Sequence, residues 1–532
     1  MIKLKCFLSS IFVISLILTS FYCCTGSRTE EAGISREETA CNLSIGWSSE
    51  DITPGQPVFI KGQFHARISE GVMDPITATA LAIESGSGPS SEKVIMISCD
   101  LVSIDKHLRD TVRGLLDESI PEINPEQVIL NATHTHTGPF VGSADKNVYG
   151  IELDAMSPSD CLKDIAGRIA RAAEQAWKSR KPGGISYGLG HAVIGHNRLT
   201  VDTTGKSTMY KKTNAGDFSH MEGYEDHSVH LLYTWDTDNN LTGIVINVAC
   251  PAQVTESAYF ISADYWHDTR TEIHRRLGKD IRILPQCSAA GDQSPHMMIG
   301  EKAEERMYRI MWPEDTAKIE NYRSSMGLRK QIALRIADAV TTVLPYMKEH
   351  IEWSPEFEHQ MDTVKLPRRL ISHEDVNKAM QESEAWKEQY NQSLSEIKDN
   401  PGIRDEPRWY ADITRLYTLT RRGQSVKARY ELQMKQPRMP VEVHVIRIDD
   451  IVLATNPFEL YLDYGMRIKS RCPAVQTFVV QLAGSGSYLP TSRSIAGGAY
   501  GAVPASTFIG PEGGQELVEE TLELIHAMWD RD

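Results

Sequence analysis

The chain has 532 residues, of which 41% are hydrophobic and 24% charged, a composition typical of a globular protein with a substantial core. Its 71 acidic and 56 basic residues give a formal net charge of −15. Because the sequence contains no basic block, we expect no nucleic acid partner.

The N-terminus, residues 1–24, has the layout of an export signal. Two lysines precede the apolar run FLSSIFVISLIL, and Cys23–Cys24 lies at the boundary that follows. This boundary indicates a bacterial lipoprotein in which one cysteine is lipidated, and simple cleavage by signal peptidase is the alternative. We therefore expect an exported protein of the bacterial cell envelope, either membrane-anchored or periplasmic. Residues 25–43 are polar and lack periodicity, which predicts a flexible tether.

Beyond the tether, apolar runs of strand length alternate with a helical pattern. The runs span residues 93–104, 127–135, 241–250 and 281–292, and each ends in polar residues. The spacing of apolar residues over 161–179 predicts a helix that Ser159 or Asp160 caps. This alternation predicts an α/β fold of mixed α+β type: one large domain, residues 44–532, with mixed sheets flanked by helices. Polar groups are expected at the strand ends.

The second half of the chain interrupts this pattern once. Residues 373–435 are charged and helical on both sides of NPGIRDEP, which predicts a helical hairpin inserted between strands. Residues 441–448 alternate as a half-buried strand does, and 451–460 form the next strand with a polar exit. The Gly- and Ser-rich stretch 484–507 is predicted to be a long structured loop over a site.

Two of the polar strand exits carry groups suited to chemistry. His134 and His136 lie in NATHTHTGP, and on an extended strand their side chains would share one face. Two such imidazoles bind a metal, or one binds a metal and the other a substrate; the alternative is a pair of polar core histidines. Ser294 in AAGDQSPH is suited to be a nucleophile or oxyanion donor, if a base or metal is adjacent, and an ordinary turn is the alternative.

Three further candidates lie near the C-terminus. Glu459 follows Asn456 and Pro457 at a strand end, where a carboxylate is a suitable metal ligand or a plain cap. Tyr488 and Tyr500 lie twelve residues apart in the Gly-rich stretch. Tyrosines in such loops often only pack, with the hydroxyl hydrogen-bonded.

Together these segments resemble the neutral/alkaline, non-lysosomal ceramidases. The similar segments, in chain order from about residue 45 to 511, are DITPGQPV, DPITATALAIE, NATHTHTGP, HNRL, AGDQSP, NPFEL, SYLPT and AYGAVPASTFIGP. The resemblance implies a metal-dependent hydrolase with one zinc ion and a lipid substrate. Such an enzyme cleaves the N-acyl amide bond of ceramide-like sphingolipids to a fatty acid and a sphingoid base.

The resemblance also implies a role for each matching residue. It implies three zinc ligands, His134, Glu459 and Tyr488, and four catalytic or substrate-contacting residues, Ser294 (the nucleophile), His136, Arg198 and Tyr500. Zinc lowers the pKa of bound water to about 7 and polarises an amide carbonyl. Arg198, His136 and Tyr500 would stabilise the oxyanion or protonate the leaving amine.

Two departures from the family limit this interpretation. The family's second zinc histidine is expected in a segment like ACHPT, but residues 247–257 read NVACPAQVTES. Cys250 or His267 would be a substitute; otherwise the site has fewer ligands, a different metal or none. The chain also resembles the catalytic domain alone, without a C-terminal β-sandwich. Two alternatives therefore stay open: a hydrolase of the same fold acting on an amide or ester of a cell-surface glycan or glycolipid, and a non-catalytic lipid- or glycan-binding lipoprotein.

Overall fold

An eight-stranded mixed sheet forms the centre of the domain. The structure, a computed structural model, describes residues 41–86, 88, 91–314 and 321–529, so the predicted export signal lies outside the described residues. In spatial order the strands are β14 (Arg282–Cys287), β12 (Leu241–Val248), β11 (Ser228–Asp236), β6 (Lys181–His191), β1 (Leu43–Asp51), β3 (Thr77–Ser85), β4 (Glu92–Cys99) and β5 (Val128–Ala132). Only the pairs β14–β12 and β4–β5 of this sheet are parallel.

A second, four-stranded sheet packs against one face of the first. Its strands, in spatial order, are β16 (Phe357–Pro367), β17 (Arg438–Ile448), β18 (Ile451–Thr455) and β20 (Gln476–Val480). Leu81 and Met96 of the large sheet share a buried core with Ile446 and Phe478 of the small one. Where both faces of a strand are buried, as in most of β4 and in β18, the sequence is almost continuously apolar.

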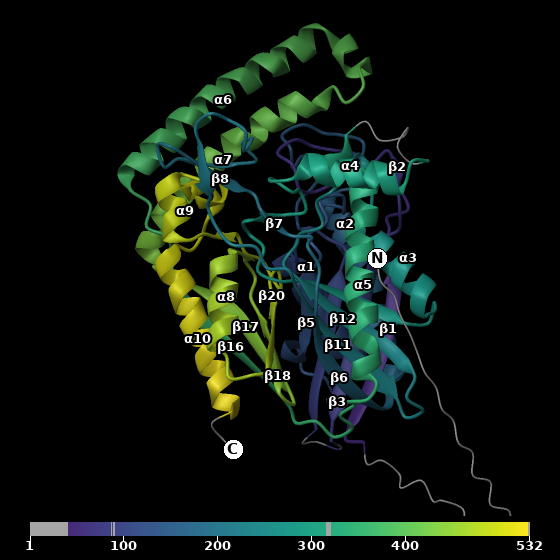
Figure 1. Ribbon diagram of the computed structural model, residues 1–532. Helices are drawn as coiled ribbons and strands as arrows, with labels where there is room; N and C mark the ends of the chain where they lie inside the picture. The colour runs from purple at the N-terminus through teal and green to yellow at the C-terminus, as the bar shows by residue number, and fades with distance from the viewer. Residues whose placement is uncertain (1–40, 87, 89–90, 315–320, 530–532) are drawn as a thin grey trace, which may run out of the picture. The chain divides into compact units, whose positions relative to one another are not determined.

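Helices cover the outer faces of both sheets (Figure 1). The large sheet packs against α1 (Lys106–Ser119), α2 (Pro158–Lys178), α3 (Tyr265–Leu277) and α5 (Met326–Met347), and the small sheet against α8 (Leu462–Arg471) and α10 (Pro511–Trp529). The predicted mixed α/β fold is confirmed, as four layers in the order helix, sheet, sheet, helix. None of the helices in the described residues is long and apolar enough to cross a membrane.

The start of α2 differs from the prediction. The helix begins at Pro158, and Ser157 caps it by accepting a hydrogen bond from the backbone N–H of Asp160 at 3.1 Å. Proline is suited to the first helical position because its missing N–H has no helical acceptor there. The predicted cap, Ser159 or Asp160, was therefore wrong, and the Asp160 carboxylate instead accepts from the Ser157 hydroxyl at 2.7 Å.

Residues 373–435 form two long helices that pack side by side, α6 (His373–Asp399) and α7 (Tyr410–Lys435) (Figure 1). The Ser383 hydroxyl of α6 donates to the Thr420 carbonyl of α7 at 2.8 Å. From α7, the Arg422 guanidinium lies 5.2 Å from the ring centroid of Tyr500. The hairpin thus contacts a residue of the predicted site.

The two edge strands of the large sheet, β5 and β14, contact each other. This contact brings the C-terminal ends of several strands close together. The Asn131 amide on β5 donates to the Pro285 carbonyl on β14 at 3.2 Å. The Asn247 amide on β12 donates to the Val479 carbonyl on β20 at 2.8 Å, joining the two sheets. The remaining elements are short: β2 (Gly71–Val72), β7 (His196–Asn197), β8 (Leu199–Asp202), β9 (Ser207–Met209), β10 (Phe218–Met221), β13 (Phe260–Ile261), β15 (Gln293–Ser294), β19 (Glu459–Leu460), β21 (Tyr488–Leu489), α4 (Glu301–Met311) and α9 (Ser492–Gly497).

Candidate active site

A polar cluster lies where the exits of five strands meet. Its side chains follow β5 (His134, His136), β12 (Gln253), β14 (Ser294), β18 (Glu459) and β20 (Tyr488). Glu459 and Tyr488 pair directly in the short parallel ladder of β19 and β21. As described below, the structure brings every predicted site residue into one connected set of contacts.

His134 and His136 face each other, but not through a shared strand face. β5 ends at Ala132, and His134 has a φ of 65°, in the left-handed region that few residues other than glycine adopt. The ring centroids are 4.9 Å apart and the two Nε2 atoms 3.4 Å apart. The Val102 carbonyl, 2.6 Å from His134 Nδ1, accepts its proton, which leaves a lone pair on His134 Nε2. The predicted extended geometry was therefore wrong, although the two rings do converge.

His136 is held in its neutral form. Burial, and then the neighbouring His134, Arg67 and Arg198, keep the pKa of His136 well below its usual range. Its Nε2 accepts a hydrogen bond from the Gln253 side-chain amide at 2.8 Å, and its Nδ1 lies 3.5 Å from Glu256 Oε2. These surroundings keep the imidazole neutral and its Nε2 lone pair engaged with Gln253.

Glu459 supplies a negative charge beside His134. Its Oε2 lies 3.4 Å from His134 Nε2, and the Tyr488 hydroxyl is hydrogen-bonded to the same carboxylate. Burial opposes the charge, but His134, Arg198 and Tyr488 together hold the pKa of Glu459 below its ordinary value. Burial and the Glu459 charge raise the pKa of Tyr488 well above its ordinary value. The phenol is therefore the donor and the carboxylate the acceptor.

Arg198 connects Tyr488, on the Glu459 side of the cluster, with Gln253 and Tyr210. Its Nη2 donates to the Gly291 carbonyl at 2.9 Å and to the Tyr488 hydroxyl at 3.2 Å, and its Nη1 to Gln253 Oε1 at 3.5 Å. The Tyr210 hydroxyl is hydrogen-bonded to the same guanidinium. Burial works against this charge, yet the neighbouring tyrosines keep the pKa of Arg198 well above its ordinary value. Arg198 therefore carries a fixed positive charge inside the cluster.

Ser294 joins the cluster through Tyr210. Ser294 lies on β15, which pairs with β7, and its side chain is fully buried. Its Oγ accepts from the Tyr210 hydroxyl at 3.1 Å and from the backbone N–H of His296 at 3.1 Å. Two donors on one serine oxygen would stabilise negative charge there, as a nucleophile requires.

Tyr500 borders the cluster on the side of the helical hairpin. Its ring lies 5.8 Å from that of Tyr488 and 6.0 Å from that of Phe64, both in edge-on geometry. Burial raises the pKa of Tyr500. Its hydroxyl is hydrogen-bonded to the Arg422 guanidinium of α7.

Gly291 allows the serine turn to approach Glu459 closely. A Cβ at Gly291 would lie 2.3 Å from the Glu459 carbonyl oxygen. We expect Gly291→Ala to lower the free energy of unfolding by about 2 kcal/mol or more, because the strand exits must separate. Urea unfolding measures this. Gly216→Ala is the control, because no atom lies within 4 Å of its added Cβ. Equal stability of the two variants would contradict the close approach.

Four contributors to the cluster were not predicted from the sequence: Tyr210, Gln253, Glu256 and His296. Tyr210 has a φ of 59°, a left-handed conformation that concentrates at functional sites, but its sequence context carries no motif. Gln253 lies in the segment 247–257, where a histidine was expected. This segment was considered as part of the site, but Gln253 was not predicted to contribute to it. The proposed substitutes for that histidine lie elsewhere.

Cys250 and His267 do not complete the cluster among the described residues. The Cys250 thiol donates to the Ile194 carbonyl at 3.2 Å within the core beneath α3 and α5. Burial raises the pKa of Cys250 well above its ordinary value, which disfavours the thiolate that binds zinc. His267 lies in the first turn of α3, where its backbone N–H donates to the Asp264 carbonyl at 3.0 Å.

The side chains of the cluster do not supply the full set of zinc ligands that the resemblance implies. His134, Glu459 and Tyr488 lie together, but residues 247–257, where a second histidine was expected, contribute the Gln253 carboxamide to the cluster. Within the parts of the chain that the structure describes, no group of three or more His, Cys, Asp and Glu side chains is arranged to hold a metal ion. Zinc therefore stays a prediction.

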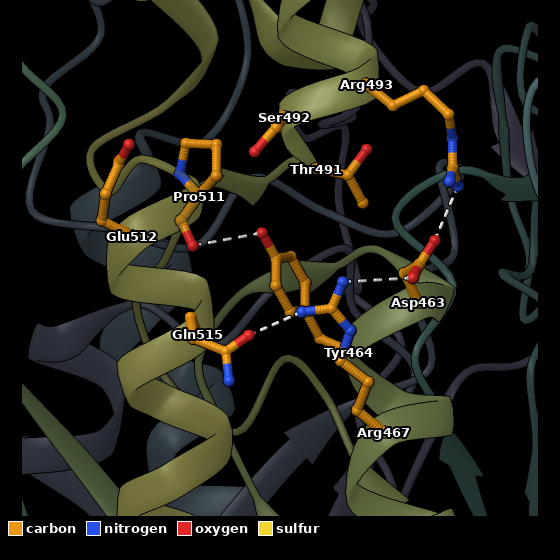
Figure 2. A pocket seen from close by; sticks show the side chains of 9 residues that line it. All are labelled: Asp463, Tyr464, Arg467, Thr491, Ser492, Arg493, Pro511, Glu512 and Gln515. Atoms are coloured by element: carbon orange, nitrogen blue, oxygen red, sulfur yellow. Dashed lines mark hydrogen bonds and ion pairs between the residues drawn. The ribbon is translucent and has the colours of Figure 1, made fainter.

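A separate, open pocket lies between α8, α9 and α10 (Figure 2). Within it the Asp463 carboxylate accepts from Arg493 at 2.6 Å and from Arg467 at 3.5 Å. Arg467 also donates to Gln515 at 2.7 Å. No predicted site residue lines this pocket, and Asp463 is paired with both Arg467 and Arg493, so we assign it no role.

Solved structures match the fold of this chain, although no family model and no curated protein matches its sequence. One is the neutral ceramidase from Pseudomonas aeruginosa, with 16% identity, a TM-score of 0.63 and coverage of 92% of this chain and 75% of that one. Another is a ceramidase complexed with C2, with 16% identity, a TM-score of 0.62 and coverage of 92% and 76%. The chain has the neutral ceramidase fold.

The neutral ceramidase fold was expected from the order of short segments along the sequence, and that expectation is confirmed at the level of the fold. At 16% identity the likeness does not extend to the roles of single residues. The assignments of His134, Glu459, Tyr488, Ser294 and the other site residues therefore remain predictions, which the contacts described above make testable.

Proposed function

We propose that the chain is an amide hydrolase that cleaves the N-acyl bond of ceramide-like sphingolipids. One observation carries the proposal: in a neutral ceramidase fold, the buried Arg198 contacts both Tyr488 and Tyr210, and Tyr210 in turn contacts Ser294. A candidate nucleophile, a fixed cation and a carboxylate are thereby connected, which is the set that acyl transfer requires.

In the proposed reaction Ser294 Oγ attacks the acyl carbonyl carbon. The serine proton is transferred through water to the nitrogen of the leaving sphingoid base. Tyr210 and the backbone N–H of His296 hold the serine oxygen, and the charge of Arg198 stabilises the oxyanion. Water then attacks the acyl-serine ester, which releases the fatty acid and restores the serine.

Tyr210 provides a sharp check on this geometry. We expect Tyr210→Phe to lower kcat by about 10²-fold with little change in KM, because the hydroxyl contacts Ser294 and Arg198 and not the lipid chains. Steady-state kinetics on a short-chain ceramide measures both constants. Tyr346→Phe, on a side chain that is 67% exposed, is the matched control. An unchanged kcat in Tyr210→Phe would contradict the role of this contact.

The substrate class is tested by offering the full-length protein a panel of ceramides and of acylated glycans and glycolipids. Fatty acid release is followed by mass spectrometry, with Ser294→Ala as the inactive control. Release from ceramides that disappears in Ser294→Ala supports the proposal. Hydrolysis of glycan or glycolipid esters alone would favour a different substrate for the same fold. Lipid binding without any hydrolysis would favour the non-catalytic lipoprotein.

We also propose that the protein is exported and anchored by a lipid, on the basis of the apolar run and Cys23–Cys24. Membrane fractionation of cells producing the full chain, and of a variant with Cys23→Ala and Cys24→Ala, tests this. The variant is expected to leave the membrane fraction. If the unaltered chain is itself found free of the membrane, the anchor is refuted.

A further inference from the structure

Gln253 lies between two groups of the site and is fixed by both. Its side chain is only 1% exposed. Nε2 lies 2.8 Å from His136 Nε2, and Oε1 lies 3.5 Å from Arg198 Nη1. Because a guanidinium has donors only, the carboxamide oxygen must face Arg198. The amide N–H therefore faces His136.

In this orientation of Gln253, His136 is not available as a ligand to a cation. The His136 Nε2 lone pair accepts the Gln253 N–H, and an N–H group itself does not bind a metal. On the other side, His134 Nε2 and Glu459 Oε2 lie 3.4 Å apart. That spacing is close to the edge of a tetrahedron with metal bonds of about 2.0–2.1 Å. His134 and Glu459 are thus placed to bind a cation, whereas His136 and Gln253 are not.

We propose that Gln253 is the residue that sets the metal affinity of this site. Among the described residues of the cluster it leaves His134, Glu459 and the Tyr488 phenol as protein ligands, and a phenol is not among the groups zinc prefers. A divalent cation bound there is therefore held weakly and exchanges with solution. The inference concerns the same site as the proposed hydrolase, but metal affinity is measured without substrate, so each can fail separately.

The experiment is a zinc titration of the full-length chain after removal of metals with a chelator. Zn²⁺ alone is the probe, and affinity is measured by competition with a chromophoric chelator. Gln253→His places an imidazole where the carboxamide was, beside His134 and Glu459. We expect Gln253→His to bind one Zn²⁺ per chain at least about 10²-fold more tightly than the wild type.

Two further variants make the test decisive. Gln253→Glu keeps the shape of the side chain and supplies an anionic oxygen, so it should also bind Zn²⁺ more tightly, and it decides the matter if Gln253→His does not fold. Gln424→His adds a histidine on α7 and should bind as the wild type does. Wild-type affinity equal to that of the folded Gln253 variants would overturn the proposal.

Discussion

Arg198→Met is expected to lower kcat/KM for N-acyl amide hydrolysis by about 10³-fold and the free energy of unfolding by about 3 kcal/mol. Methionine fills similar space but supplies no donor. The Gly291 carbonyl then loses the guanidinium donor, the Tyr488 hydroxyl keeps only its hydrogen bond to Glu459, and the Glu459 carboxylate loses its nearby cation. Steady-state kinetics and urea unfolding measure the two effects.

Two substitutions bracket this result. Arg198→Lys keeps the charge but loses the planar fork, so it should fall between the wild type and Arg198→Met. Arg171→Met, on the exposed face of α2, should match the wild type in both measurements. Activity of Arg198→Met within a few-fold of the wild type would remove Arg198 from the mechanism.

Glu459→Gln is expected to have the second-largest effect, about 10²-fold in kcat/KM and about 2–3 kcal/mol in the free energy of unfolding. Glutamine has the same shape, so the loss isolates the negative charge. That charge faces His134 Nε2 at 3.4 Å and balances the buried Arg198. The kinetics of the Gln variant in zinc-free buffer gives the first number and urea unfolding the second.

The stability effect of Glu459→Gln should depend on pH in a defined direction. The neighbours hold the pKa of Glu459 below its ordinary value of 4.5, so the unfolded chain binds this proton more readily than the folded one. The stabilisation is fully present above the unfolded pKa and is lost as pH falls through the folded one. The stability difference from the Gln variant should therefore be constant from about pH 7 to 5 and shrink below that. A difference that grows on acidification would reverse the assignment.

The two substitutions should also be coupled. Each one alone leaves a buried charge without its partner, whereas the double variant leaves neither. We therefore expect the double variant to be less destabilised than the sum of the single ones, by about 1 kcal/mol or more. Strict additivity would mean that Arg198 and Glu459 do not interact through the cluster.

The sequence predicted the strands well and the site only in part. The runs now seen as β4, β5, β12 and β14 were visible because both faces of each strand are buried, so nearly every residue in them is apolar. The start of α2 was misplaced because the cap was sought inside the periodic pattern and not before Pro158. Local sequence patterns thus predicted the strands of the sheets but not the residues at which helices begin.

The contacts within the site lay beyond any local pattern. Periodicity does not indicate that Glu459 would face His134, and the left-handed φ of His134 broke the strand alternation on which its direction was predicted. Only the resemblance of ordered segments grouped these residues. Tyr210 and Gln253 were missed because a tyrosine or glutamine outside a motif carries no signal until the fold brings it to a charged partner.

The closure of the large sheet through Asn131 and Pro285 has a consequence for folding. That contact joins residues 154 positions apart, and the cluster also needs Glu459, Tyr488 and Tyr500 from near the end of the chain. Contacts of such long sequence separation form slowly, because chain entropy must be lost before they form. The polar cluster is therefore expected to assemble last, after the N-terminal strands and helices have packed, so a growing or truncated chain would acquire stable layers well before it acquired this cluster.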